Sequence, residues 1–189
     1  YEYRVTPSAF PEITSDSISC VPGRFSTTPV AACELNDIAQ GIAVDGTYAY
    51  VADYRFGLQV VDIADPESPR LVATCGTAGD AQDVVVLDSV AYVADWDEGL
   101  CIIDVSDPSQ PGGPMYVDTS DAAGVSVTGG YAYVADRASG LAIIDVSDPA
   151  NPGQPVYAST SYAEDVDVAG SYAYVADGLS GLTIIDVTE

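Results

Sequence analysis

The sequence predicts an all-β fold: a four-bladed β-propeller closed by an N-terminal clasp strand and preceded by an extended N-terminal arm. The first observation is a strand-like motif ending in Ala-Asp, which occurs four times with the closing residues Asp53, Asp95, Asp136 and Asp177. The second is an apolar strand motif that follows each of these aspartates after a short turn. Repeats of about 40 residues built from short strands are typical of propeller blades.

Each repeat predicts strands in a fixed order, and the third repeat illustrates it. Its four strands are expected at residues 124–127, 131–136, 141–145 and 155–159. Gly129-Gly130 tolerates the positive φ angles of a tight hairpin between the first two strands. The prolines that follow the third strand stop it before the fourth begins. The first two repeats have the same order, whereas the fourth ends after its third strand.

The number of strands predicts how the ring closes. Residues 29–35 resemble residues 69–75, which are the expected fourth strand of the first repeat. The chain therefore begins with one strand of this kind and lacks it in the last repeat. Pairing the two would complete a fourth blade and leave no sheet edge uncovered. We expect residues 1–28 to be an arm and residues 29–189 to be the propeller.

The composition excludes several functions. There are 29 acidic residues against five arginines, no lysine and no histidine, and the net charge is −24. Such a chain offers no basic patch for nucleic acid. The missing histidine and lysine remove the usual general base, zinc ligand and Schiff-base nucleophile, so we predict a protein that is not an enzyme. A carboxylate pair of the glycosidase kind stays open. No apolar run reaches the length of a membrane span.

The four cysteines predict an oxidising location. Cys20, Cys33, Cys75 and Cys101 include no metal-type Cys-x-x-Cys pair, and no histidine could complete a zinc site. We expect the disulfides Cys20–Cys33 and Cys75–Cys101, because the last two belong to neighbouring strands of adjacent blades. The alternative is that the thiols are buried as small apolar groups.

Two sets of repeated aspartates are expected to be structural. Asp62, Asp104, Asp145 and Asp186 end the third strands and share a strand face with the preceding leucines. We expect them to point between blades and to accept hydrogen bonds from backbone amides. The turn aspartates, such as Asp53, are expected to cap amides two residues later. The alternative cofactor is calcium, held by Asp95, Asp97 and Glu98 or by Asp165 and Asp167.

The turns after the second strands carry a candidate ligand face. Tyr54, Phe56 and Trp96 place aromatic side chains on one side of the predicted ring. Aromatic residues in loops are typical of recognition surfaces, and a glycan or a protein would be the ligand. The alternative is that these side chains pack between subunits or against the N-terminal segment.

The N-terminal arm has the pattern of a half-buried strand. Residues 1–6 alternate apolar and polar side chains, and the arm carries Tyr1, Tyr3, Val5, Phe10 and Ile13 as a candidate subunit interface. Added as a strand to a neighbouring copy, head to tail, the arm would build a filament. The alternative is a flexible tail. The first residue is tyrosine, as expected of a processed chain or a fragment.

The third strands carry a Leu-x-Ile/Val-Ile/Val-Asp motif, seen at residues 58–62, 100–104, 141–145 and 182–186. The motif resembles the LVIVD-repeat family, whose propeller-type repeats are common in bacterial and archaeal surface and secreted proteins. The resemblance covers residues 29–189 and implies a propeller at the cell surface or outside the cell, without a settled catalytic role.

These observations predict a non-enzymatic extracellular structural subunit. It would polymerise into a filament of identical subunits by donating its N-terminal arm to a neighbouring propeller. The alternative function is a secreted or cell-surface binding module that recognises a glycan or a protein, assisted by calcium. Neither function involves nucleic acid or a membrane span.

Overall fold

The computed structural model describes residues 19–20, 23–24 and 28–188, and the chain divides into two units, Tyr1–Val30 and Ala31–Glu189. In the first unit, β1 (Ser19–Cys20) and β2 (Gly23–Arg24) form a short antiparallel pair. The predicted interface residues of the arm lie outside the described residues.

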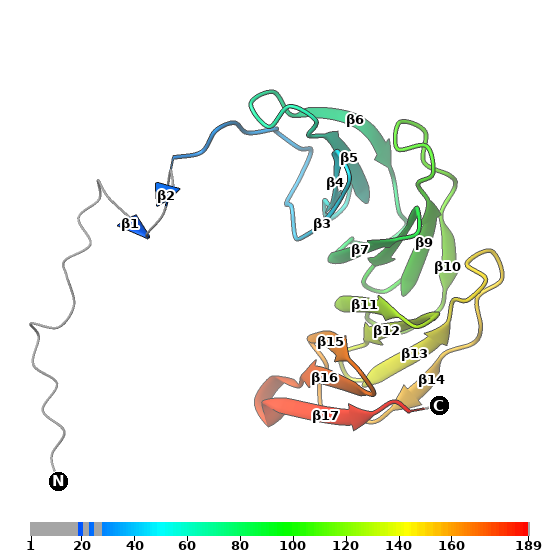
Figure 1. Ribbon diagram of the computed structural model, residues 1–189. Helices are drawn as coiled ribbons and strands as arrows, with labels where there is room; N and C mark the ends of the chain where they lie inside the picture. Colours follow the sequence, from blue (N-terminus) through cyan, green and yellow to red (C-terminus); the bar gives the residue numbers. More distant parts are fainter. Residues whose placement is uncertain (1–18, 21–22, 25–27, 189) are drawn as a thin grey trace, which may run out of the picture. The chain divides into compact units, whose positions relative to one another are not determined.

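The second unit consists of four antiparallel sheets whose strands follow chain order (Figure 1). The first sheet contains β3 (Gly41–Asp45), β4 (Tyr48–Ala52), β5 (Leu58–Asp62) and β6 (Arg70–Cys75). The second contains β7 (Asp83–Leu87), β8 (Val90–Ala94), β9 (Leu100–Asp104) and β10 (Met115–Val117). The third contains β11 (Gly124–Thr128), β12 (Tyr131–Ala135), β13 (Leu141–Asp145) and β14 (Val156–Ala158). The fourth contains β15 (Asp165–Ala169), β16 (Tyr172–Ala176) and β17 (Leu182–Asp186), with the short 3-10 helix η2 (Gly178–Ser180) between the last two.

The four sheets follow one another around an arc, with the first strand of each sheet on the inside. β3 lies beside β7, β7 beside β11 and β11 beside β15 (Figure 1). This arrangement confirms the predicted all-β repeat fold. None of the helical segments in the described part of the chain is long or apolar enough to cross a membrane.

The core lies between the sheets and not within one of them. Successive side chains of a strand point to opposite faces, so Tyr92 of β8 packs toward the third sheet while Val93 packs toward the first. Tyr133 and Val134 of β12 repeat this division. Both faces of a middle sheet are buried in this way. That burial explains why these strands are continuously apolar instead of alternating with polar residues.

The predicted clasp is not formed. Residues 28–40 contain no strand, and the fourth sheet has three strands instead of four. The end of this segment is bound to the first sheet: the amides of Asn36 and Asp37 donate to the Asp53 carboxylate at 3.0 and 3.1 Å, and the Gln40 amide donates to the Ala52 carbonyl at 2.8 Å. These bonds hold the chain where it enters β3. Among the described residues, no strand pairs with the outer edge of β17.

Candidate interaction surfaces

The turn aspartates are buried hydrogen-bond acceptors, as expected, but their donors are not those predicted. Asp95 accepts from the Thr77 hydroxyl at 2.6 Å and the Gly79 amide at 2.9 Å. Asp53, Asp136 and Asp177 bind the equivalent segments, with amides 15 to 17 residues earlier in the chain. In the first turn, the amide of Phe56 donates to the main-chain carbonyl of Asp53 and not to its carboxylate. The side chain therefore joins the turn after the second strand of a sheet to the loop that leads into the same sheet.

Burial and hydrogen bonding move the pKa of these carboxyls in opposite directions. Desolvation by burial raises the pKa of Asp95 against the opposing effect of its donors. The amide of Tyr162, the first of several donors, lowers the pKa of Asp177. The difference arises because the Asp177 carboxylate receives the amides of Ser161 and Tyr162 and also the Thr183 hydroxyl.

The aspartates that end the third strands do not point between blades, so that prediction was wrong. Each accepts a hydrogen bond from the amide two residues later: Ala64, Ser106, Ser147 or Thr188, at 2.8 to 3.0 Å. Asp145 is exposed, although Leu141 on the same strand face is fully buried. The packed part of the interface ends before the last strand position, and the side chain turns to its own loop instead.

The predicted calcium ligands do not converge. Asp95 is buried with both carboxylate oxygens engaged, whereas Asp97 and Glu98 are exposed. Within the described residues, no three His, Cys, Asp or Glu side chains form a group suited to a metal ion. Asp165 and Asp167 lie along one strand, and each accepts from the amide of the next residue. Calcium binding stays a prediction without a preformed site.

The predicted cysteine pair lies together but forms no disulfide. Cys75 and Cys101 belong to one cluster between the first and second sheets, as the repeat spacing predicted, and both thiols are free. The Cys75 thiol donates to the Gly112 carbonyl at 3.5 Å, and burial raises the pKa of the Cys101 thiol. Cys33 is also a free thiol. The side chain of Cys20, its predicted partner, lies outside the described residues.

The aromatic turns connect neighbouring sheets. Tyr54, Trp96 and Arg137 occupy equivalent positions with positive φ, and their backbones form antiparallel bridges to Ala81, Ala122 and Ala163 of the next repeat. Positive φ is uncommon outside glycine, so these three backbones are held by their bridges. The candidate ligand face therefore also contributes to the contact between sheets.

The side chains of this face have partners that the sequence did not reveal. The Arg137 guanidinium lies 4.4 Å from the centre of the Trp96 ring and 5.5 Å from that of Tyr162, and it pairs with Glu164 at 2.9 Å. Arg55 lies 5.9 Å from the Tyr54 ring. Of Tyr54, Phe56 and Trp96, Phe56 is the exposed residue, with 43% of its surface open to solvent. Alignment of the equivalent turn positions is the signal that could have found Arg137.

The first and fourth sheets, at the two ends of the arc, each expose a face whose equivalents in the other sheets are buried. Leu58, Leu100 and Leu141 are 0% exposed, whereas the equivalent Leu182 is 63% exposed. Val84, Val125 and Val166 are buried, whereas the equivalent Ile42 of the first sheet is 66% exposed. We call these two surfaces the fourth-sheet face (Tyr174, Leu182, Ile184) and the first-sheet face (Ala39, Ile42, Val44). They carry the residue types of an interior interface without its burial.

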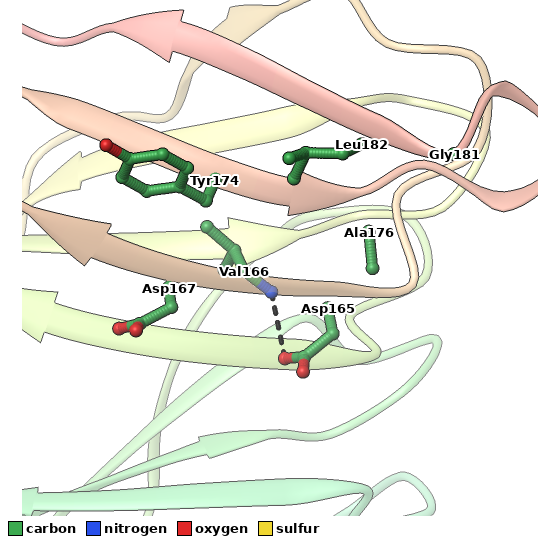
Figure 2. A pocket seen from close by; sticks show the side chains of 7 residues that line it. All are labelled: Asp165, Val166, Asp167, Tyr174, Ala176, Gly181 and Leu182. Atoms are coloured by element: carbon green, nitrogen blue, oxygen red, sulfur yellow. Dashed lines mark hydrogen bonds between the residues drawn. The ribbon is translucent and has the colours of Figure 1, made fainter. Parts of the chain in front are cut away.

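Figure 2 shows part of the fourth-sheet face, with Tyr174 and Leu182 above the carboxylates of β15. A cavity of about 280 Å³ is lined by Asp165, Val166, Asp167, Tyr174, Ala176, Gly181 and Leu182. One oxygen of Asp165 accepts from the Val166 amide at 2.8 Å. The equivalent Asp83 makes the same bond and uses its other oxygen to accept from Val125 of the third sheet at 3.0 Å.

Comparison with known proteins identifies the repeat and the fold. The LVIVD repeat model matches residues 37–77, 78–119, 120–154 and 161–189. A comparison with curated proteins found no match.

Solved structures with low sequence identity share the fold. The computationally designed Ika4 protein is 9% identical with a TM-score of 0.67, over 87% of this chain and 100% of its own. The computationally designed Ika8 protein is 8% identical with a TM-score of 0.62, over 79% of this chain and 46% of its own. A functionally unknown protein from Desulfotomaculum acetoxidans DSM 771 is 14% identical with a TM-score of 0.63, over 82% of this chain and 57% of its own. This chain thus spans about half the length of two of the three.

Proposed function

Because the chain belongs to the LVIVD-repeat family, we propose that it is an extracellular structural subunit that assembles with identical copies into a filament. The observation that carries the assembly with identical copies is the exposure of Leu182 and Ile42 at the two ends of the arc. A large exposed apolar surface that matches a buried one elsewhere in the same molecule favours a protein partner over water. The extracellular location rests on the family resemblance.

The N-terminal arm is the proposed link between neighbours in the filament. Tyr1, Tyr3 and Val5 alternate with polar residues, which is the pattern that strand addition to another chain requires. An arm donated from each copy to the next makes a heterologous contact, and repetition of that contact produces a filament instead of a closed pair. The filament therefore depends on residues 1–28.

The repeated carboxylates support a structural role over catalysis. The turn aspartates accept amides of the loop that leads into their own sheet, and the strand-end aspartates accept the amide of the loop that follows them. A catalytic acid or base must instead face a substrate. We propose that the chain is not an enzyme.

Negative-stain imaging of the full chain tests the filament, with a chain that begins at Pro29 as the comparison. We expect filaments from the full chain and separate particles from the shortened one. A further variant, Tyr3→Asp with Val5→Asp, should behave like the shortened chain because it places charges on the apolar face of the arm. Indistinguishable particles from all three would contradict the proposal.

A second candidate function is recognition of a glycan or protein at the aromatic turns. The exposure of Phe56 beside Tyr54 and Arg55 favours it. Phe56→Ala should abolish binding in a glycan array or a pull-down, with and without calcium, and should leave assembly unchanged. Trp96→Ala is a less selective variant because Trp96 also packs against Arg137.

A further inference from the structure

We propose that two copies of this chain close into one ring of eight sheets, in which the fourth-sheet face of each copy packs on the first-sheet face of the other. The inference rests on the proposed assembly of identical copies and assigns the contact within it. The arms, residues 1–28, are not part of this contact and remain free to link one ring to the next.

The two faces repeat an interface that the chain already contains. Between the third and fourth sheets, Tyr133 and Leu141 form one apolar cluster with Ala163 and Val166. The equivalents on the fourth-sheet face are Tyr174 and Leu182, and those on the first-sheet face are Ala39 and Ile42. All four of these equivalents are exposed, and Ala39 is exposed although Ala81, Ala122 and Ala163 are completely buried. A second copy would bring together the side-chain types that pack inside each copy.

The inner strands supply a polar match for the same contact. The first residues of β3, β7, β11 and β15 alternate as Gly41, Asp83, Gly124 and Asp165. A Cβ at Gly41 would lie 2.7 Å from Asp83, and one at Gly124 would lie 2.7 Å from Asp165, so glycine lets the aspartate of the next sheet approach.

Asp165 would continue this alternation into the second copy. The Oδ2 atom of Asp83 accepts from the amide that follows Gly124. No bond is found for Oδ2 of Asp165 among the described residues, where only the Val166 amide donates to that carboxylate. In the proposed ring, Asp165 meets Gly41 of the second copy and accepts from its Ile42 amide, as Asp83 accepts from Val125. The alternation stays in phase only when the number of sheets is even.

The incomplete fourth sheet fits the same arrangement. Cys33 precedes β3 by the same interval by which Cys75 precedes β7, and Cys75 lies opposite Leu58 in the first sheet. Residues 31–35 of one copy would therefore pair with β17 of the other, placing Cys33 opposite Leu182. A Cβ at Gly57 would collide with the Cys75 carbonyl at 2.5 Å, whereas one at Gly181 would meet no atom of the described residues within 4 Å. No described strand thus occupies the outer position beside β17.

A second copy accounts for these features better than closure within one chain. The first-sheet and fourth-sheet faces are both exposed in the same molecule, so four sheets do not complete a ring. The match to this chain covers all of the designed Ika4 protein but only 46% of the larger designed Ika8 protein. Two arcs of four sheets, each donating one face and accepting one, form a closed assembly with twofold symmetry.

The experiment measures particle mass and sheet number on the full chain. Native mass spectrometry at low concentration should give twice the 19.5 kDa of one chain or even multiples of it. Class averages of negatively stained or frozen particles, or of the repeating particle in a filament, should contain eight sheets around one channel. Filaments whose particle has four sheets would overturn the ring and leave the proposed filament standing. Eight-sheet rings without filaments would support the ring and overturn the proposed filament.

Substitutions on the two faces sharpen the test. Leu182→Glu should halve the particle mass while the far-UV circular dichroism spectrum stays that of a β protein, because Leu182 is exposed in one copy. Val156→Glu, on the exposed outer strand β14, is the matched control and should keep the doubled mass. Combining Leu182→Glu with Ile42→Lys should restore part of the doubled species, because opposite charges then meet. Equal masses for the original chain and Leu182→Glu would overturn the proposal.

Discussion

The third sheet contains two aspartates that recur in every repeat, and their surroundings differ sharply. Asp136 is completely buried and accepts the amides of Ser120 and Asp121, which enter the sheet from the preceding loop. Asp145 is exposed and accepts the Ser147 amide of its own turn at 2.9 Å. Two residues that recur in every repeat therefore need not contribute equally to the stability of the fold. The buried carboxylate holds two segments together, whereas the exposed one shapes a single loop.

The largest expected effect is the loss of the buried acceptor. Asp136→Ala leaves two amides without a partner inside the protein, and breaking buried hydrogen bonds to a charged group costs about 2 to 4 kcal/mol. Urea unfolding should report this as a lower midpoint with an unchanged slope. A decrease in the free energy of unfolding below about 1 kcal/mol would mean that buried Asp136 contributes no more to stability than exposed Asp145 is expected to.

A second test compares two buried turn aspartates, Asp95 and Asp177, whose pKa values shift in opposite directions. Asp177 has a lowered pKa, so its stabilising contribution is present above the unfolded pKa of about 4 and is lost as pH falls through the folded pKa. Asp95 has a raised pKa, so the stability linked to its proton is present at low pH and is lost as pH rises through the folded value.

The stability gap between the original chain and each Asn variant should therefore change in opposite directions. Between pH 6 and pH 3, the gap to Asp177→Asn should shrink, and the gap to Asp95→Asn should widen. Thermal unfolding in matched ionic strength measures both gaps. If both gaps changed in the same direction with pH, the pKa shifts of Asp95 and Asp177 would not have opposite signs.

The smallest expected effect belongs to the exposed aspartate. Asp145→Ala removes one local hydrogen bond at a solvated turn and should lower the free energy of unfolding by less than about 1 kcal/mol. The same urea experiment measures it, with Asp136→Ala as the internal reference. A loss as large as that of Asp136→Ala would show that the turn after β13 is critical to the sheet.

Much of the fold could be predicted because its signals are local. Apolar strand motifs, hairpin glycines and proline turns recur at a fixed interval, and each prediction needed only neighbouring residues. The partners of the aspartates were harder, because Asp136 reaches back to Ser120 and Asp121, and strand alternation alone does not say where packing ends. The contact between Trp96 and Arg137 joins two repeats, so neither turn revealed it by itself.

The remaining differences concern pairing, which composition does not determine. Spacing placed Cys75 and Cys101 in one cluster, but the direction of each thiol depends on nearby partners such as the Gly112 carbonyl. The similarity of residues 29–35 to a blade strand did not specify which edge they would join. The chain instead binds its first sheet through Asn36 and Asp37, and this left the end faces outside the sequence prediction.

The alternation of Gly41, Asp83, Gly124 and Asp165 also bears on how such a protein could change size during evolution. Duplicating a single repeat would set two aspartates or two glycines side by side, which creates either crowding and repulsion or an unfilled space. Duplicating a pair of repeats would reproduce every existing neighbour relationship. The natural genetic increment for this architecture is therefore two repeats, and lineages should gain or lose them in twos.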